Sequence, residues 1–265
     1  MNDEPLYRNK EWLYDQFVLQ GKECTEIAKE NGWTARVVQK WVQEKNGWRN
    51  HTRRDEVKPT DRQLQIIYGG MLGDGCISKR LDIDFTQYIF VQVEHHKDYV
   101  NWVLKELWNL CKSKTPSIQI KSKKGFEEEF TYNYQPTHRI ATRGYKFLTE
   151  LYNLSNKDII DRLDELGLSL YFLDDGCFNK SKQWELCMGS MDENEVDFFI
   201  NIMKEKFNID IYKKYLFKNK YGEYWYVKLT VDESKKLNEI ILRNIPNELD
   251  VIQRKIFRNG DTDVE

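Results

Sequence analysis

The chain has 265 residues, with 41 lysines and arginines against 43 aspartates and glutamates, and a formal net charge of −2. Its 40% of hydrophobic residues can build the core of one large or two modest domains, and its 32% of charged residues indicate a water-exposed surface. No apolar run is long enough to cross a membrane, and the first residues lack a signal-peptide pattern. These features exclude membrane and secreted classes, so we expect a cytoplasmic protein whose five cysteines are reduced.

Residues 1–48 are predicted to form a separate, all-helical unit. Apolar residues recur at helical spacing, and helices are expected over residues 10–19, 25–32 and 34–46, with Gly47 ending the third. The second and third helices have the residue spacing of a helix-turn-helix motif. This motif needs a small residue where the helices cross, a glycine in the turn and two core positions after it. These four residues are Ala28, Gly32, Val38 and Trp41.

The open side of the third helix would then carry Arg36, Gln39, Lys40 and Gln43. This mix of side chains can contact phosphates and base edges in a major groove of DNA. A small three-helix interaction module with an ordinary solvated face is the alternative interpretation.

The polar stretch at residues 49–60 predicts a linker. Its basic residues, among them Arg53 and Arg54, could follow a DNA backbone, although a solvated linker is the simpler interpretation. Thr60 then caps a helix that begins at Asp61 and runs to Asp74.

Two apolar helical runs, at residues 67–76 and 168–177, end in the same three residues, Asp-Gly-Cys, with 101 residues between equivalent positions. The order strand, strand, helix, strand, strand, helix is predicted after each run, so one unit occurs twice. Strands are expected at 77–85, 90–95, 118–123, 130–142, 177–178, 184–188, 210–217 and 224–231, with the first turn near Thr86 and Gln87. Helices are expected at 97–110, 144–154, 193–207 and 232–244.

Each of the two runs places a carboxylate at the C-terminal end of a helix, where negative charge is unfavourable. Gly75 and Gly176 suit the end of a helix, so Asp74 and Asp175 should lie at C-terminal helix ends, where the helix dipole disfavours negative charge. Such a pair is costly unless a cation lies between the two acids. Hard oxygen ligands without a neighbouring cysteine–histidine set favour Mg²⁺ over zinc. The alternative is that each Asp-Gly pair simply caps a helix before a turn.

Glycines at three- and four-residue spacing, Gly69, Gly70 and Gly73, clear one face of the first run. Another helix could approach that face closely, as small-residue faces allow in membrane helices. Two such helices packed side by side would bring both aspartates together at one end. Cys76 and Cys177 are expected to be small core residues just after the helices.

Both runs resemble the LAGLIDADG motif of homing endonucleases. The first reads Ile-Tyr-Gly-Gly-Met-Leu-Gly-Asp-Gly, and the second reads Leu-Ser-Leu-Tyr-Phe-Leu-Asp-Asp-Gly, which is similar to the aromatic second motif of some two-repeat members. The second run departs from the nine-letter pattern at Leu170 and Asp174. The resemblance covers about residues 61–265 and implies an α+β fold with two pseudo-symmetric αββαββα repeats, at 61–160 and 161–265, that form a saddle over DNA.

In the resembled family the eighth motif position supplies the metal-binding acid, which here means Asp74 and Asp175. The implied ion is Mg²⁺, and Mn²⁺ or Ca²⁺ could occupy the same site. Gly73 and Asp174, which precede the two acids, belong to the same metal-site set, although Asp174 lies on another face of its helix and is the less favoured ligand.

The resemblance also implies a catalytic lysine near the end of each repeat. Lys157 fits this place in the first repeat, whereas Glu248 occupies the aligned position in the second, so that Lys255 is the nearest candidate there. Gln92 or Glu94 would support the first metal site, and the sequence leaves this choice open.

The free faces of the two sheets would contact DNA, with lysines and arginines binding phosphates and polar side chains reading bases. For each residue alone, an ordinary surface charge is the alternative. The candidates are Lys79, Arg80, Gln119, Lys121, Lys123, Arg139 and Arg143 in the first repeat, and Lys180, Lys182, Lys213, Lys218, Tyr226 and Lys228 in the second.

Together these expectations describe a monomeric, Mg²⁺-dependent, site-specific endonuclease that cuts double-stranded DNA with a long recognition site. The terminal residues lack the nucleophile and asparagine of protein splicing, so we expect a free-standing or intron-encoded enzyme of a bacterial, phage or organellar genetic element. Two alternatives stay open. One is a DNA-binding regulator that has lost cleavage, and the other is an RNA-splicing maturase on the same scaffold.

Overall fold

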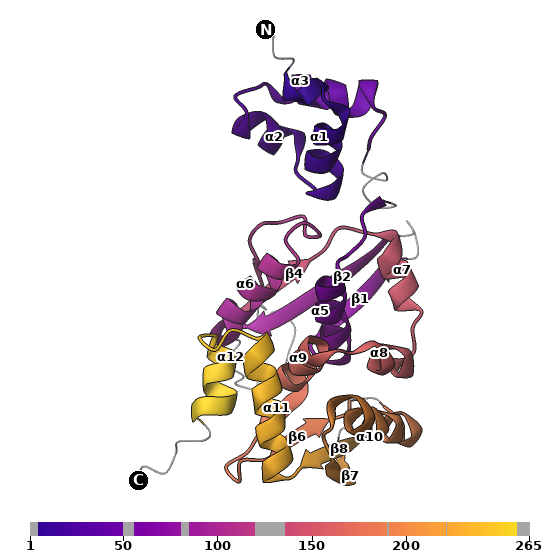
Figure 1. Ribbon diagram of the computed structural model, residues 1–265, viewed down its shortest axis with the longest axis vertical. Helices are drawn as coiled ribbons and strands as arrows, with labels where there is room; N and C mark the ends of the chain where they lie inside the picture. The colour runs from indigo at the N-terminus through magenta and orange to yellow at the C-terminus, as the bar shows by residue number, and fades with distance from the viewer. Residues whose placement is uncertain are drawn as a thin grey trace, which may run out of the picture.

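The computed structural model describes residues 5–49, 56–80, 85–119, 136–189, 191–220 and 222–258. It has an α+β fold in which a helical N-terminal region precedes two four-stranded antiparallel sheets with their helices. These three parts follow one another along the long axis (Figure 1). Within the described residues, no helix is both long enough and apolar enough to cross a membrane.

Helices occupy the N-terminal region where the apolar spacing predicts them. The first and third predicted helices each continue into a wider, π-helical turn, and Gly32 and Gly47 take the left-handed conformation, with φ of +70° and +69°. The elements are η1 (Leu6–Arg8), α1 (Lys10–Tyr14), η2 (Asp15–Leu19), α2 (Cys24–Glu30), α3 (Ala35–Gln39) and η3 (Lys40–Lys45). Leu13, Ile27 and Val38 are fully buried among them.

The first repeat runs from a helix through one sheet to a closing pair of helices. Its elements are α5 (Asp61–Leu72), β1 (Gly75–Arg80), β2 (Phe85–Val93), η4 (Glu94–His96), α6 (Lys97–Glu106), β3 (Ser117–Gln119), β4 (Thr137–Ala141), α7 (Lys146–Tyr152) and α8 (Asn156–Arg162). The strand order in the sheet is β1-β2-β4-β3.

The second repeat has the same order of elements. They are α9 (Glu165–Asp175), β5 (Gly176–Phe178), β6 (Trp184–Cys187), α10 (Glu193–Phe207), β7 (Ile211–Asn219), β8 (Gly222–Leu229), α11 (Val231–Asn244), α12 (Asp250–Ile252) and η5 (Gln253–Arg258). The strand order β5-β6-β8-β7 matches that of the first sheet, which confirms the duplicated α+β architecture.

Two sequence-based expectations about the elements are wrong. Thr86 and Gln87 lie inside β2, opposite Lys79 and Ser78, so they do not form the predicted turn between the first two strands. Thr86 is buried and bonds Thr149 of α7, a contact between distant segments that no local pattern reveals. Helix α8, which Ser155 and Asp158 cap at its start, is missing from the predicted elements.

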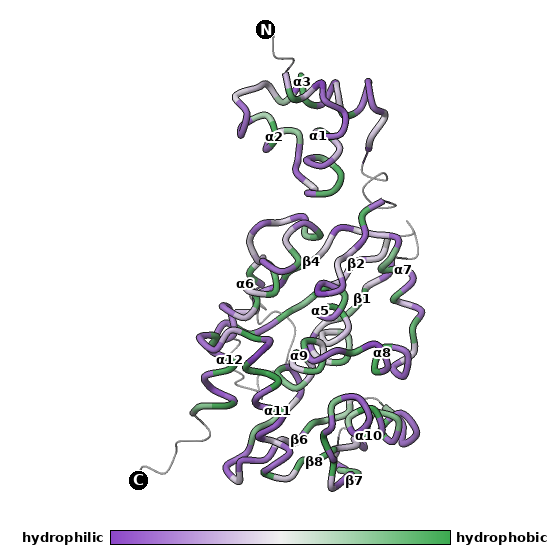
Figure 2. The backbone as a smooth tube through the Cα atoms, in the orientation of Figure 1, coloured by the Kyte–Doolittle hydropathy of each residue, from purple (hydrophilic) through white to green (hydrophobic). Residues whose placement is uncertain are grey.

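Each sheet has one face packed on helices and one face free of them. Along β2, Tyr88, Phe90 and Gln92 are buried, while Ile89 and Val91 between them are half-exposed. Apolar segments gather in the strands and central helices, and polar segments follow the outer loops (Figure 2). This alternation leaves one face of each sheet available for a ligand.

Helices α5 and α9 pack against each other so closely that a side chain does not fit at their crossing. A Cβ atom added to Gly69 would lie 2.3 Å from the carbonyl oxygen of Gly167 and 2.9 Å from Cβ of Leu170. The glycine spacing in the first run therefore predicts the close helix pair correctly. Gly167, the partner on α9, was not anticipated.

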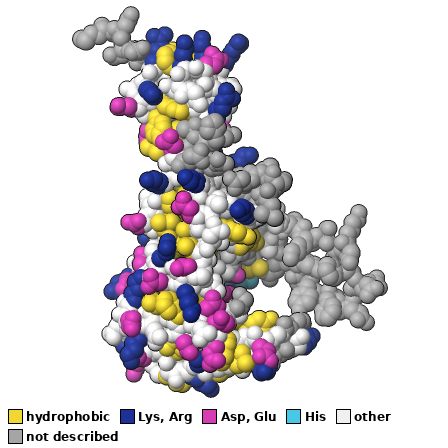
Figure 3. Space-filling model, turned by 90° about the vertical axis from the view of Figure 1, so that its right-hand side faces the viewer, with side chains coloured by type: hydrophobic (Ala, Val, Ile, Leu, Met, Phe, Trp, Pro, Cys, Tyr) yellow, Lys and Arg dark blue, Asp and Glu magenta, His cyan; other side chains and the backbone are white. Residues whose placement is uncertain are grey.

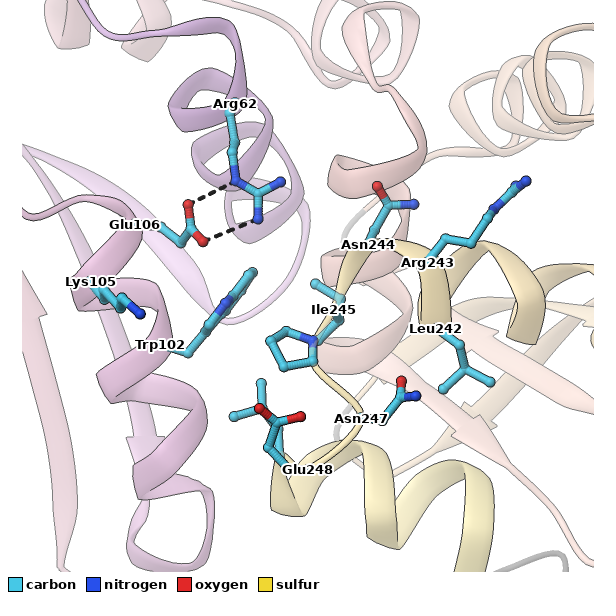
Figure 4. A pocket seen from close by; sticks show the side chains of 12 residues that line it. Arg62, Trp102, Lys105, Glu106, Leu242, Arg243, Asn244, Ile245, Asn247 and Glu248 are labelled. Carbon is cyan, nitrogen blue, oxygen red and sulfur yellow. Dashed lines mark hydrogen bonds and ion pairs between the residues drawn. The ribbon is translucent and has the colours of Figure 1, made fainter.

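A cleft of about 570 Å³ lies between the repeats, on their helical side. Trp102 of α6 and the segment after α11, including Ile245, border it, and Arg62 of α5 forms two hydrogen bonds with Glu106 at its edge (Figure 4). The cleft is not lined by either motif aspartate, so it is distinct from the acid pair described below.

Arg143 joins the first repeat to the N-terminal region. Its Nη2 donates to Oε1 of Glu23 at 2.9 Å, and its Nη1 donates to the carbonyl of Cys111 at 3.2 Å. Gly21, with φ of +67°, allows this approach, because a Cβ atom there would lie 2.9 Å from Nη1 of Arg143. Arg143 therefore serves to hold the two parts together.

Replacement of Arg143 by alanine is expected to weaken this docking by about 1–2 kcal/mol, because a charge-assisted bond and a carbonyl contact are both lost. The check is the distance between spin labels on α3 and α7, whose distribution should broaden. Lys22→Met removes an ion pair with Glu30 inside the N-terminal region and should leave that distribution narrow. Equal distributions in the Arg143→Ala and wild-type chains would contradict the assignment.

Candidate active site

The two motif aspartates come together at one end of the α5–α9 pair. Helix α5 ends at Leu72 and is followed by Gly73 and Asp74, while α9 ends at Asp175. The backbone N–H of Asp74 donates to Oδ2 of Asp174 at 3.2 Å, which ties the two helix ends directly. The ends of the two motif helices therefore lie side by side, with Asp74 after one helix and Asp175 as the last residue of the other.

The negative charge of Asp74 affects the pKa of Asp175. Burial, and to a smaller extent the negative charge of Asp74, raises the pKa of Asp175 to about 6, against the opposing effect of Lys255. Asp74 is exposed, and Asp175 is partly exposed. Two carboxylates that repel each other at a solvent-accessible point form a favourable place for a cation.

Asp174 acts as a link between the repeats. Its Oδ1 accepts a bond from the Tyr99 hydroxyl at 3.1 Å, and its Oδ2 accepts the Asp74 N–H. Burial and the charge of Asp74 raise its pKa well above the ordinary value. Both oxygens are occupied by protein donors, so the structure does not favour Asp174 as a metal ligand, contrary to its place in the predicted set.

Gly73 allows the link to form, because a Cβ atom at this position would lie 2.5 Å from Cβ of Asp174. Its role is thus to let the two helix ends approach each other closely.

Cys76 and Cys177 are exposed, and their predicted core positions are wrong. The preceding glycines are buried, and strand alternation turns the cysteines to the free face.

The choice between Gln92 and Glu94 follows from the geometry. Nε2 of Gln92 donates to Oδ2 of Asp74 at 2.6 Å, and Gln92 is 8% exposed at the end of β2. Glu94 instead bonds the ring of His138 on β4. Gln92 is therefore the residue that supports the first acid.

Lys255 lies behind the second acid. Its Nζ donates to the carbonyl oxygens of Leu173 at 2.5 Å and Gly176 at 2.7 Å, with that of Asp174 at 3.3 Å. Burial lowers its pKa, while the nearby acids act in the opposite direction. The lysine thus compensates the negative end of the α9 dipole beside Asp175.

Lys157 is not brought to the acids. It is exposed on α8, with Nζ 5.9 Å from the ring centroid of Phe198 on α10. Helix α8 ends against Gln65, whose Nε2 bonds the carbonyl of Arg162 at 2.8 Å. Gln65 is nine residues before Asp74, which corresponds to about 13 Å along the axis of α5. Helix α8 therefore packs near the N-terminal end of α5, whereas the acids lie at the C-terminal end.

Lys255→Met is expected to lower the free energy of unfolding by about 2–4 kcal/mol, because three partly buried carbonyls lose their charged donor. Urea denaturation at neutral pH measures this loss. Lys157→Met is the matched control, since its exposed ammonium makes no hydrogen bond of this kind, and it should change stability little. Equal effects of the two substitutions would contradict the capping role of Lys255.

The donor chemistry of the acid pair fits a hard cation. Asp74 and Asp175 offer carboxylate oxygens, and the described part of the chain contains no cluster of three or more histidine, cysteine, aspartate or glutamate side chains suited to a metal. Mg²⁺ is commonly bound by one or two carboxylates, with water and substrate phosphates filling its other positions. Two acids at an open point of the surface meet this requirement.

Several predicted DNA-binding residues lie on accessible surface. Arg139 on β4 is partly exposed between two buried residues, which places it on the free face of the first sheet. Lys213 on β7 is paired with Lys228 on β8, which lies between two buried residues and forms an ion pair with Glu185 on β6 at 3.1 Å. Lys180 and Lys182 are exposed in the hairpin between β5 and β6.

Other candidates from the same set have different surroundings. Lys79 faces the helical side, with Nζ 5.8 Å from the ring centroid of Tyr152 on α7. Lys218 forms an ion pair with Glu223 directly across the hairpin. Arg143 bonds the N-terminal region, as described above. Charge alone does not reveal the partners of a side chain, so the sequence does not separate these three residues from the candidates on the free faces.

Some candidates cannot be placed. Arg53, Arg54, Lys121 and Lys123 lie outside the described residues, as does the side chain of Arg80.

The third helix of the N-terminal region carries its predicted polar face. Arg36, Gln39 and Lys40 are exposed, and Gln43 is partly exposed one turn further on, where it accepts a bond from Gln39 at 3.3 Å. Lysine and arginine side chains gather at the outer end of this region (Figure 3).

Tyr99 is a functional residue that the sequence did not reveal. It is fully buried on α6, and its hydroxyl bonds Asp174. A tyrosine on the apolar side of an amphipathic helix is indistinguishable from an ordinary core residue in the sequence.

Comparisons with known proteins agree with the fold. A family model described as the LAGLIDADG DNA endonuclease family matches residues 64–237. The structure of the homing endonuclease I-WcaI bound to its DNA recognition sequence has a TM-score of 0.58 and 20% identity, covering 74% of this chain and 86% of that chain. The structure of I-DmoI in complex with DNA and Mn has a TM-score of 0.42 and 14% identity, covering 69% and 98%.

Two curated relatives are cytochrome b mRNA maturases bI2. The one from Saccharomyces cerevisiae is 28% identical over 156 residues, which is 55% of this chain and 37% of the relative. The one from Debaryomyces hansenii is 28% identical over 160 residues, which is 57% of this chain and 60% of the relative. The matched part therefore spans less than two thirds of either relative.

Proposed function

Because the chain belongs to the LAGLIDADG DNA endonuclease family, we propose that it is a site-specific endonuclease that hydrolyses both strands of DNA. Asp74 and Asp175 would hold the divalent cations, with Mg²⁺ as the physiological ion. The observation that carries this proposal is the convergence of the two acids, in which the charge of Asp74 contributes to the raised pKa of Asp175.

The protein side chains have separable roles in this reaction. A bound divalent cation supplies an activated water and stabilises the leaving oxygen. Gln92 fixes the orientation of the Asp74 carboxylate, and Asp174 holds the two helix ends at one separation. Lys255 places a positive charge behind Asp175 and stabilises the end of α9.

The substrate surface would comprise the free faces of both sheets. Arg139, Lys213 and Lys228, together with the hairpin lysines, would contact phosphates, while the neighbouring polar groups would read bases. The third helix of the N-terminal region would enter a major groove as a separate reading element. A monomer with three reading elements would recognise a long site.

Cleavage is tested with a linear duplex that joins the two DNA sequences flanking the coding region, in the presence of Mg²⁺. The wild type should cut both strands, whereas Asp74→Asn and Asp175→Asn should each slow cleavage by about a thousandfold, or about 4 kcal/mol, while retaining DNA binding. Asp61→Asn is the control, because Asp61 is an exposed acid at the opposite end of α5. A wild type that binds this duplex without cutting it would contradict the proposal and favour a DNA-binding regulator.

A second candidate function is support of RNA splicing, which the two maturase relatives favour. The intron RNA surrounding the coding region is the probe. Under this alternative the chain would bind that RNA tightly and promote its splicing, and Asp74→Asn would leave splicing unchanged.

A further inference from the structure

A chain of polar contacts runs from the C-terminal segment of the second repeat to the acid of the first. Nη1 of Arg254 lies 3.4 Å from Nε2 of His96, and Nδ1 of His96 lies 3.2 Å from Oε1 of Gln92. Gln92 in turn donates from Nε2 to Oδ2 of Asp74 at 2.6 Å. Three contacts thus connect residues that are 180 positions apart in the sequence.

Each contact in this chain has a defined donor and acceptor. An arginine can only donate, so Nε2 of His96 accepts, and the proton of a neutral imidazole must be on Nδ1. That N–H donates to Oε1 of Gln92, which turns the NH₂ group toward the acids. The carboxylates require the same orientation, because they accept and do not donate.

The surroundings of His96 support this protonation state. Burial first, and then the neighbouring His95, Arg254 and Lys255, lower its pKa to about 4, against the opposing effect of Asp250. The ring is therefore neutral near pH 7, as the direction of the contacts requires.

The segment that carries Arg254 is fixed by its own packing. The backbone N–H of Asp250 donates to Oδ2 of Asp98 on α6 at 2.6 Å, and Val251 and Ile252 are buried. The next residue along η5, Lys255, bonds the carbonyls at the end of α9. The backbone at Arg254 is therefore held in place by the contacts of residues 250–252 before it and of Lys255 after it.

We propose that Arg254 and His96 are positioning residues that hold the Gln92 amide in the orientation that donates to Asp74. This inference rests on the proposed role of Asp74 in cleavage. Reversal of the amide would place Oε1 against the carboxylate and replace an attraction by a repulsion. Residues that orient the groups around a metal site through hydrogen bonds typically contribute about 10- to 100-fold to metal affinity or activity.

Among the residues that the structure describes, the second repeat has no counterpart of the Gln92 contact with the motif acid. Phe90 is paired with Gly75 in the first sheet as Leu186 is paired with Gly176 in the second, so the counterpart of Gln92, two residues further on, is Met188. Met188 is buried and has no N–H to offer its acid. The contact chain therefore acts on one acid, and its loss should affect one DNA strand.

The test uses two substitutions of the same shape at position 96. His96→Asn keeps an N–H donor near the position of Nδ1, whereas His96→Asp offers only acceptors there. On the flanking-sequence duplex with Mg²⁺, His96→Asp should slow by about 10-fold or more the same strand that Asp74→Asn slows, so that nicked DNA accumulates. His96→Asn should cut both strands at rates close to wild type.

Arg254→Met should slow that same strand, and Arg243→Met serves as the control, because Arg243 is a surface arginine paired with Glu165. Equal slowing of both strands by His96→Asp would overturn the proposal, as would equal defects in the aspartate and asparagine variants. Either result would indicate a purely structural role for His96.

A second measurement needs no DNA. The ¹⁵N spectrum of the full chain should show His96 protonated on Nδ1 and not on Nε2, and Arg254→Met should shift both signals, together with the side-chain amide of Gln92. Protonation on Nε2 in the wild type would overturn the proposal. If the wild type cuts no DNA, the proposed function fails, and this spectrum still decides whether the contact chain exists.

Discussion

Gly69→Ala is expected to lower the free energy of unfolding by about 3 kcal/mol or more, because the added methyl group overlaps main-chain atoms of the neighbouring helix. The ideal Cβ position lies 2.3 Å from the carbonyl oxygen of Gly167. No rotamer change removes that atom, so relief requires the two motif helices to separate. Since the acids lie at the end of this pair, cleavage should fall together with stability.

A neighbouring glycine provides the matched comparison. A Cβ atom at Gly70 would lie 2.0 Å from the hydroxyl oxygen of Tyr88, which is the far end of a side chain and has no hydrogen-bond partner. The double variant Gly70→Ala/Tyr88→Phe should therefore recover much of the stability that Gly70→Ala loses.

Gly69→Ala should not recover with Tyr88→Phe, because its obstacle is backbone. Urea denaturation of the four variants checks both expectations. A loss below about 1 kcal/mol in Gly69→Ala would mean that the helices are not in close contact.

Asp175→Asn is expected to increase stability above pH 6 while it slows cleavage. The folded-state pKa of about 6 lies above the ordinary value of 3.8, so the folded chain binds this proton more tightly than the unfolded chain does. Stability therefore falls as pH rises from about 4 to about 6, and the full cost persists at higher pH. Asparagine carries no charge, so the variant should gain about 2 kcal/mol at pH 7.5 and nothing at pH 4.

Denaturation of both proteins at the two pH values, without divalent ions, measures this gain. Asp61→Asn should show no comparable pH-dependent gain, because its carboxylate is exposed and distant from the acid pair. Addition of Mg²⁺ should stabilise the wild type more than Asp175→Asn, since the variant has lost one of the two proposed ligands. A stability difference that does not change with pH would contradict the unfavourable ionisation of Asp175.

The sequence predicts those features of the fold that depend on local chemistry. Helix α10 begins and ends where predicted, because Asp192 forms a capping box at its start and Asn208 takes the left-handed conformation at its end. The two motif acids also lie at helix ends, as the repeated Asp-Gly pair predicts, although Gly176 is extended (φ −82°, ψ 150°) and both glycines begin strands. These signals lie within a few residues of the structures that they determine.

The features that the sequence did not reveal depend on contacts between distant segments. Lys157 has the spacing of a catalytic lysine, but its place is decided by the packing of α8 against Gln65 and α10. In the sequence, Arg143 cannot be told from a phosphate-binding arginine, because its partner Glu23 is 120 residues away. No local pattern distinguishes such residues from their alternatives.

The C-terminal segment has a consequence for biosynthesis. Lys255 contacts the end of α9, and the neighbouring Arg254 reaches the first repeat through His96. Ribosomes release a chain from its N-terminus, so a nascent protein could bind DNA with its early helices and first sheet well before residues 250–258 emerge. Full cutting competence would then be acquired late in translation, and prematurely terminated products would pose little danger to the genome of the host cell.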